Sequence, residues 1–352
     1  MPREKRRRRD DGRYHRASRS DDSDRPRSEL VRYNSDEAVN FTKYALKDFA
    51  VVFETCKSVV SLSSIQNGDF LIACSGTVVD HVGSETWILA SATLVRISGT
   101  EYEAYNGDNI KIEVVLHNRQ TVEGFLAMCD LHYNLAIVTI KSPIDLPAVK
   151  LSDLPEYYSM QLKPVVAVGR DTKSIVLMRS GKLIRENSHL DCNELLVCTC
   201  DVNESFIGGP IMDMENRIVG ITSLYMETTP LLPVEIAARC LKSFKNYKTL
   251  LPWLRVRGQA VHKLDLPVCD ISPENCGGIE IGDVISELDE VNLYSVAQFT
   301  VMFLEKLEAA KDTLNTVTLQ AVVQRPTDTT FLANLNVREV FSGKCDKSFQ
   351  NS

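Results

Sequence analysis

The feature that most constrains this chain is a series of short apolar segments between residues 70 and 224, separated by turn residues. The segments are rich in Val, Ile and Thr, which favour strands, and Gly, Asn and Asp stand between them. Because no long helical pattern interrupts the series, we expect an all-β barrel or sandwich. The predicted strands lie at residues 70–79, 86–92, 110–116, 121–129, 134–140, 165–168, 174–177, 194–199 and 217–224.

The remainder of the chain indicates a second, smaller folding unit. Residues 233–247 have the pattern of one amphipathic helix, which we expect to close the first unit. About 90 residues follow it, enough for a mixed domain that could fold alone. In that domain we predict a helix at residues 296–309 and strands at 253–256, 283–288, 316–323 and 331–337.

The first 35 residues differ in composition from the rest and are dense in Arg, Asp and Ser. They hold too few apolar groups to repay the entropy of ordering, so we predict a disordered basic tail. A compact basic run in this tail predicts either a nuclear localisation signal or only a solvated charged segment. The run consists of Lys5, Arg6, Arg7, Arg8 and Arg9.

Charge and hydropathy exclude several classes of partner. Residues 1–30 carry a net charge of +4, whereas the remainder holds 29 basic and 40 acidic residues. An acidic body does not form a nucleic-acid surface, so only the tail could contact nucleic acid. No apolar run approaches the roughly 18–20 residues that span a bilayer, and no secretory signal is evident. We therefore expect an intracellular protein, nuclear or cytoplasmic, that does not bind membranes.

The ten cysteines and six histidines are scattered along the chain. No CxxC pair occurs, and the histidines do not complete a metal-ligand spacing. In a reducing compartment, cysteines in this pattern are small buried apolar residues. The sequence therefore predicts no metal site, no disulfide framework and no cofactor.

Three blocks resemble the segments around the catalytic triad of HtrA/Deg-type trypsin-like serine proteases. Residues 74–79 (CSGTVV) and 87–95 (WILASATLV) resemble the family's Gly-Ser-Gly strand and its Ile-Leu-Thr-x-x-His-Val-Val block. Residues 130–137 (DLHYNLAI) resemble Asp-x-x-x-Asp-Leu-Ala. Residues 206–211 (FIGGPI) and 216–221 (NRIVGI) resemble Gly-Asn-Ser-Gly-Gly-Pro-Leu and Val-Ile-Gly-Ile.

The end of the chain resembles the PDZ domain that is linked to these proteases. The similar segments are residues 253–256 (WLRV), 272–274 (SPE) and 282–285 (GDVI). Together the resemblances imply a mainly β chain, with a trypsin-like double β-barrel followed by a PDZ-like α+β domain. The predicted divisions are a tail at 1–35, the barrel domain at 36–248, the PDZ-like domain at 249–342 and a tail at 343–352.

All three positions that match the triad carry the wrong chemistry for a serine protease. The alignment places Thr93 where the family has its His base and Asn134 where it has the orienting Asp. Ile207 occupies the position of the nucleophilic Ser, and Ser205 replaces a Gly of the oxyanion loop. Ser205 and Ile207 could still offer backbone N–H groups to an oxyanion. The resemblance therefore implies a pseudo-protease that binds polypeptides or acts as a scaffold.

The alternative is an active endopeptidase with a displaced site. His132 lies two residues before Asn134, so on an extended strand it would point to the same side and approach Thr93 or Ser205. The competing interpretation of His132 is an exposed loop histidine.

The resemblance to a PDZ domain implies a groove for polypeptide segments or protein C-termini, at Leu254, Arg255 and Val256 beside the helix at residues 296–309. Arg255 replaces a Gly of the family and could attract a carboxylate or point to solvent. The other possibility is that the domain packs on the barrel and binds nothing. Active relatives form trimers, which implies a homo-oligomer or a mixed oligomer with active relatives.

Overall fold

A computed structural model of the chain describes residues 55–247 and 278–338, apart from short internal gaps. The candidate peptide-binding residues, the basic run and the predicted tails at 1–35 and 343–352 lie outside the described residues. Within the described ranges, no helix is both long and apolar enough to cross a bilayer. The gaps are residues 98–102, 106–108, 142–145, 152–162, 185–187, 189, 191, 224–227, 280–282, 311–315 and 327–328.

The first six strands close into a barrel in the order β1-β2-β3-β6-β5-β4. Its interior is filled by a cluster of buried apolar side chains, among them Leu62, Ile88 and Val114. In β4 (KIEVV) apolar and polar residues alternate and direct one face inward, whereas β3 and β6 are buried along nearly their whole length. The strands are β1 (Val59–Gln66), β2 (Asp69–Val82), β3 (Glu85–Ser91), β4 (Lys111–Val115), β5 (Thr121–Asp130) and β6 (Leu135–Lys141).

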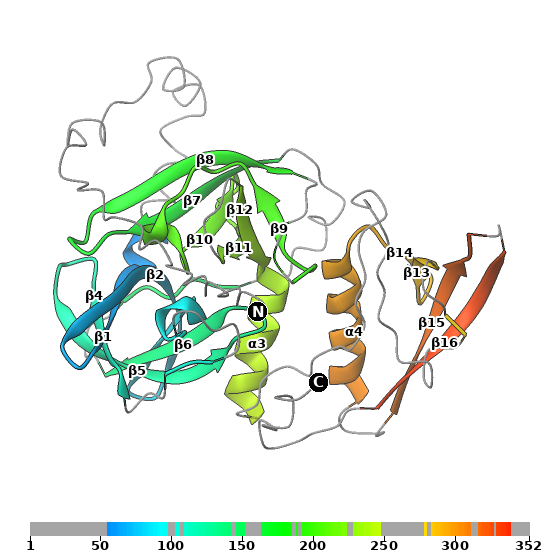
Figure 1. Ribbon diagram of the computed structural model, residues 1–352, viewed down its shortest axis with the longest axis horizontal. Coiled ribbons are helices and arrows are strands. Elements are labelled where there is room, and N and C mark those ends of the chain that lie inside the picture. Colours follow the sequence, from blue (N-terminus) through cyan, green and yellow to red (C-terminus); the bar gives the residue numbers. More distant parts are fainter. Residues whose placement is uncertain are drawn as a thin grey trace, which may run out of the picture. The chain divides into compact units, whose positions relative to one another are not determined.

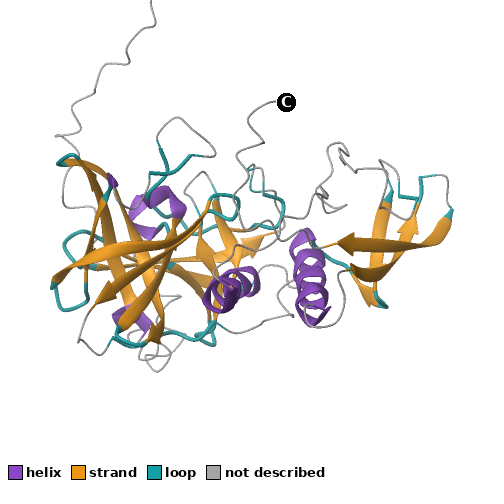
Figure 2. Cartoon of the chain, turned by 90° about the horizontal axis from the view of Figure 1, so that it is seen from below, coloured by secondary structure: helices purple, strands orange, loops and turns teal. Residues whose placement is uncertain are grey.

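A second six-stranded barrel follows in the order β10-β11-β12-β9-β8-β7, and helix α3 (Val234–Tyr247) comes after its last strand. Figure 1 shows the first barrel in blue and cyan beside the second in green, and Figure 2 shows how few helices accompany the strands. The prediction of a mainly β double barrel is confirmed. The strands are β7 (Pro164–Arg170), β8 (Val176–Ile184), β9 (Leu196–Cys198), β10 (Pro210–Asp213), β11 (Ile218–Thr222) and β12 (Thr229–Pro233).

Two strands of the second barrel were not predicted from the sequence. β10 and β12 are short, at four and five residues, and each contains a proline near an end. Proline cannot donate to a ladder, so such a segment does not show a strand pattern by itself. β10 is nevertheless central, because it pairs with β7 on one side and β11 on the other.

Hydrogen bonds between buried groups join the two barrels. The Ser75 hydroxyl in β2 donates to the Ser205 carbonyl at 2.5 Å and accepts from the Arg170 backbone N–H at 2.8 Å. The Arg170 guanidinium is buried and donates to the carbonyls of Cys56, Val59 and Ser174. A buried cation needs such acceptors, so these bonds fix the end of β7 against the start of β1.

The C-terminal part is a four-stranded antiparallel sheet with one helix, α4 (Val296–Ala310). The helix and strands share a small apolar core that includes Leu288, Phe303 and Leu319. Asp283 lies in the segment that resembles the PDZ Gly-Asp-Val-Ile motif. Its two carboxylate oxygens accept hydrogen bonds from Nε and Nη2 of Arg325, each at 2.9 Å. The strands are β13 (Val284–Leu288), β14 (Val291–Asn292), β15 (Thr316–Gln324) and β16 (Thr330–Arg338) in the order β14-β13-β15-β16.

Candidate functional site

Thr93 and Asn134 form a hydrogen-bonded pair. Thr93 lies in the short helix η3 (Ala92–Leu94), where the Ser91 side chain caps the turn and its hydroxyl donates to Thr93 at 2.9 Å. The Thr93 Oγ1 atom lies 3.2 Å from Asn134 Oδ1 and 3.1 Å from Asn134 Nδ2. The structure thus brings together two of the three positions that the sequence aligned with a triad.

Asn134 is anchored on both sides of the junction between the barrels. It lies in the turn between β5 and β6 with φ of 52°, a left-handed conformation that Asn tolerates better than most residues. Its Nδ2 group donates to the Ser223 carbonyl at 2.8 Å, just beyond β11. The pair therefore bridges the barrels, but an amide and a hydroxyl supply neither a base near neutral pH nor a negative charge.

Ile207, at the nucleophile position, is 1% exposed and belongs to the buried cluster of the first barrel. Its carbonyl accepts a hydrogen bond from the Ser75 N–H at 2.8 Å. The side chain thus contributes to the core rather than to a surface that a substrate could reach. Burial of a side chain of this size stabilises the folded state by about 1.5–3 kcal/mol relative to leaving it exposed.

The backbone after Ile207 can be built only with glycine. Gly208 has φ of +77°, and a Cβ atom there would lie 2.4 Å from the Ser75 carbonyl oxygen. At Gly209 a Cβ would lie 2.2 Å from the Val168 carbonyl oxygen. Packing of the loop against β2 and β7 therefore requires glycine at positions 208 and 209, whether or not the loop has a catalytic role.

The two N–H groups that the sequence suggested for an oxyanion hole are occupied within the loop. Helix η6 (Glu204–Phe206) begins at Asn203, whose side chain accepts from the Ser205 N–H at 3.1 Å. The Ile207 N–H donates to the Glu204 carbonyl at 3.1 Å. An oxyanion hole requires donors that point to where the oxyanion forms. In this structure both donors are directed at acceptors of their own segment.

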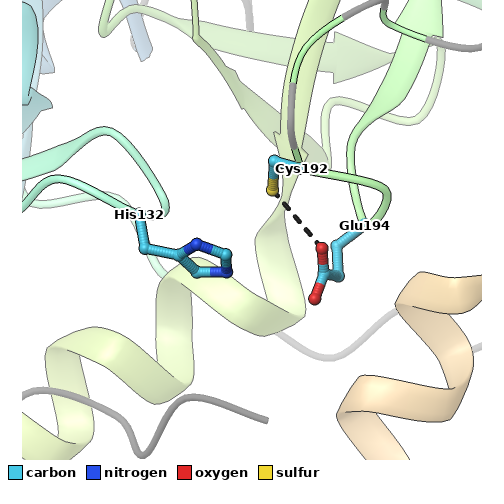
Figure 3. Close-up of side chains that lie close together, drawn as sticks. All are labelled: His132, Cys192 and Glu194. Atoms are coloured by element: carbon cyan, nitrogen blue, oxygen red, sulfur yellow. Dashed lines mark hydrogen bonds between the residues drawn. The ribbon is translucent and has the colours of Figure 1, made fainter. Parts of the chain in front are cut away.

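His132 does not have the environment of an exposed loop residue. Its ring is half-buried and packs edge-on against Tyr133, with centroids 4.6 Å apart. One of its ring nitrogens instead lies within 4.8 Å of the Cys192 sulfur and a Glu194 carboxylate oxygen (Figure 3). Sequence spacing gave no sign of this cluster, because 60 residues separate His132 from Cys192.

Burial favours the protonated forms of the Cys192 thiol and of the neighbouring Asp130 carboxyl. Burial, followed by the Glu194 carboxylate, raises the pKa of the Cys192 thiol well above its ordinary value. Burial also raises the pKa of Asp130, although the backbone N–H groups of Tyr133 and His132 lower it in part. The described cysteines are all free thiols. Such a thiol is a poor nucleophile, because reactive cysteines need a nearby positive charge.

The double barrel, the order of its blocks and the Thr93–Asn134 pair define a domain of the trypsin-like serine peptidase class. In agreement, residues 74–221 match the family described as "Trypsin-like peptidase domain". The chain therefore contains a trypsin-like peptidase domain.

A comparison with curated proteins refines this assignment. The chain is 26% identical over 198 residues to "Putative protease Do-like 14" of Arabidopsis thaliana. The alignment covers 52% of this chain and 44% of that relative, so the chain spans less than half of the protein it matches. With the family match, this similarity supports an HtrA/Deg-type domain, as the sequence blocks predicted.

Proposed function

We propose that the trypsin-like domain does not cleave peptide bonds and instead acts as a polypeptide-binding or scaffolding domain. The observation that carries the proposal is Ile207, which replaces the nucleophile with a hydrocarbon buried in the first barrel. Covalent catalysis needs a reactive atom that a substrate carbonyl can approach. Ile207 provides no such atom.

The remaining parts of a serine mechanism are also missing from the aligned positions. The pair of Thr93 and Asn134 keeps the connection of a base and its orienting group but holds no base. The N–H groups of Ser205 and Ile207 are directed into helix η6 and its cap. Three separate losses at one place favour an inactive domain over a partly impaired enzyme.

The proposed binding role rests on the second resemblance. The C-terminal sheet and helix α4 have their own apolar core, as a PDZ-like module requires. We propose that polypeptide segments or protein C-termini add beside the strand predicted from the sequence at Leu254, Arg255 and Val256, residues outside the described ranges. Assembly into a homo-oligomer or with active relatives, and residence in the nucleus or cytoplasm, belong to the same proposal.

The test of inactivity is a cleavage assay with unfolded casein and labelling with a serine-directed fluorophosphonate, both on the purified full chain. We expect neither cleavage nor labelling. Cleavage that is lost in Ser205→Ala or His132→Ala would overturn the proposal and establish a displaced site. A His132→Ala effect that a metal chelator reproduces would instead indicate metal-dependent hydrolysis.

The test of binding is fluorescence polarisation with a library of C-terminal peptides on the full chain. We expect some peptides to bind with a free carboxylate and to weaken by at least about tenfold as the C-terminal amide, because an anion held by N–H groups is lost. Arg255→Ala tests whether this arginine holds the carboxylate, and Arg119→Ala, which removes a turn arginine of the first barrel, is the matched control. Equal binding of acid and amide forms would argue against a PDZ-like groove.

A further inference from the structure

Three potential metal ligands from two distant parts of the sequence converge beside the former triad. Figure 3 shows the imidazole of His132 facing the thiol of Cys192 and the carboxylate of Glu194. One ligand atom from each side chain lies within 4.8 Å of the other two. The Cys192 sulfur and Glu194 Oε2 are 3.4 Å apart. This trio is the group of possible metal ligands found in the described residues.

The backbone holds His132 in place before any ion binds. The buried Asp130 carboxylate accepts hydrogen bonds from the N–H groups of His132 at 3.0 Å and Tyr133 at 3.1 Å. The Tyr133 ring is buried and packs against the imidazole. A side chain whose backbone and ring are both fixed loses little entropy when it coordinates an ion.

The other two ligands are carried by one turn. The Leu195 N–H donates to the Cys192 carbonyl at 3.3 Å, so residues 192–195 form a β-turn that precedes β9. The sulfur of Cys192 and the carboxylate of Glu194 lie on the same side of the turn, and the Cys192 thiol donates a hydrogen bond to Glu194 Oε2. Cys192 is 7% exposed, whereas Glu194 and His132 are half-buried. An ion could therefore enter from the side of Glu194 and His132.

The geometry points to a metal site: we propose that His132, Cys192 and Glu194 bind a divalent transition-metal ion, Zn²⁺ in preference to Mg²⁺ or Ca²⁺. Ligands at ordinary Zn²⁺ bond lengths in a tetrahedral site are about 3.3–3.7 Å from one another. The sulfur and carboxylate oxygen already have this separation, and an imidazole nitrogen lies within 4.8 Å of both side chains' ligand atoms. Water fills the fourth position.

The chemistry of the three side chains accounts for this choice of ion. Sulfur and imidazole nitrogen are ligands of Zn²⁺ and related ions, whereas Mg²⁺ and Ca²⁺ bind almost entirely through oxygen. On binding, the S–H bond of Cys192 breaks, a sulfur–metal bond forms and the proton leaves to solvent. A thiolate and a carboxylate then balance the two positive charges of the ion.

The site would have a structural consequence. His132 belongs to the turn between β5 and β6 of the first barrel, whereas Cys192 and Glu194 precede β9 of the second. One bound ion would therefore connect the two barrels next to the Asn134–Ser223 hydrogen bond. The inference is independent of peptide binding and of the loss of proteolysis.

The experiment is a titration of the metal-free full chain with Co²⁺, which substitutes for Zn²⁺ and absorbs strongly when bound to thiolate. We expect one thiolate-to-cobalt band that Zn²⁺ bleaches by displacement. In Cys192→Ser the band is lost. In His132→Ala and Glu194→Gln the dissociation constant rises by at least about 100-fold, because loss of even an outer-shell partner costs 10–100-fold.

The matched control is Cys129→Ser, which removes a partly buried thiol outside the trio and should leave the titration unchanged. A cobalt band that survives in Cys192→Ser would assign binding to other cysteines and overturn the proposal. The absence of any thiolate-to-cobalt band in the wild-type chain would also overturn the proposal. If Cys192→Ser does not fold, the cobalt titration of Glu194→Gln is the deciding test. A cobalt dissociation constant in Glu194→Gln equal to that of the wild type would overturn the proposal. Fluorophosphonate labelling does not bear on either result.

Discussion

The Thr93–Asn134 pair and the neighbouring cluster around His132 differ in what they preserve. The pair has the hydrogen-bond geometry of a catalytic site without titratable side chains, whereas the cluster has titratable side chains without a recognised motif. The Thr93–Asn134 pair keeps the connected arrangement of a catalytic pair, yet both side chains are neutral. His132, two residues before Asn134, lies close to Cys192 and Glu194, and no sequence motif predicts this cluster of titratable groups. The hydrogen bonds of the pair do not require catalytic side chains, because they also hold the barrels together.

The comparison predicts that changes at the former triad alter stability, whereas changes at the cluster alter metal binding. The largest effect is expected from Gly208→Ala. The new Cβ would lie 2.4 Å from the Ser75 carbonyl oxygen, and φ is positive, so the loop must move. We expect a loss of about 4 kcal/mol or more in the free energy of unfolding, measured by urea denaturation. Gly68→Ala, also at positive φ but with no atom near its Cβ, is the control and should lose much less.

Ile207→Ala should follow, with a loss of about 2–5 kcal/mol in the free energy of unfolding. The physical reason is the cavity left in the first barrel by a side chain that is 1% exposed. Cobalt affinity should stay at the wild-type value, measured in the same preparation. A large drop in cobalt affinity would mean that the two places are coupled rather than separate.

Asn134→Ala should destabilise by about 1–3 kcal/mol, since it leaves the partly buried Thr93 and the buried Ser223 without its amide. Part of the loss comes from a positive φ that alanine tolerates poorly. Asn134→Gly separates the two causes, because glycine accepts this φ but also lacks the amide. Equal stability of wild type and Asn134→Gly would show that the hydrogen bonds contribute nothing.

The last prediction concerns alkaline pH and the core thiols. Burial raises the pKa of Cys56 from 9.0 to about 11 and the pKa of Cys74 to about 12. Because these folded-state values lie above the unfolded value, the stabilisation is complete below pH 9 and is lost as pH rises toward 11–12. We expect each thiol to cost about 1.4 kcal/mol per pH unit in that window, measured by urea denaturation. Cys74→Ala should flatten the slope.

The sequence determined the barrel class and which residues stand at the positions aligned with the triad. Strands at 70–79, 86–92 and 121–129 could be predicted because short apolar segments alternate with turn residues, and the strands appear there as β2, β3 and β5. Thr93, Asn134 and Ile207 could be placed because the flanking blocks fix their position in the fold. β10 and β12 could not be predicted, since their pairing partners rather than their own residues make them strands.

Only the tertiary structure decided what those positions do. The sequence left open whether the N–H groups of Ser205 and Ile207 point inward, and the cap at Asn203 and the turn of η6 direct both to local acceptors. It also predicted no metal site, because ligand spacing along the chain reveals only sites built from adjacent segments. His132 and Cys192 meet because β5–β6 of one barrel and the β9 approach of the other are brought together by folding. Local pattern encodes the strands, whereas long-range packing determines which side chains share a site.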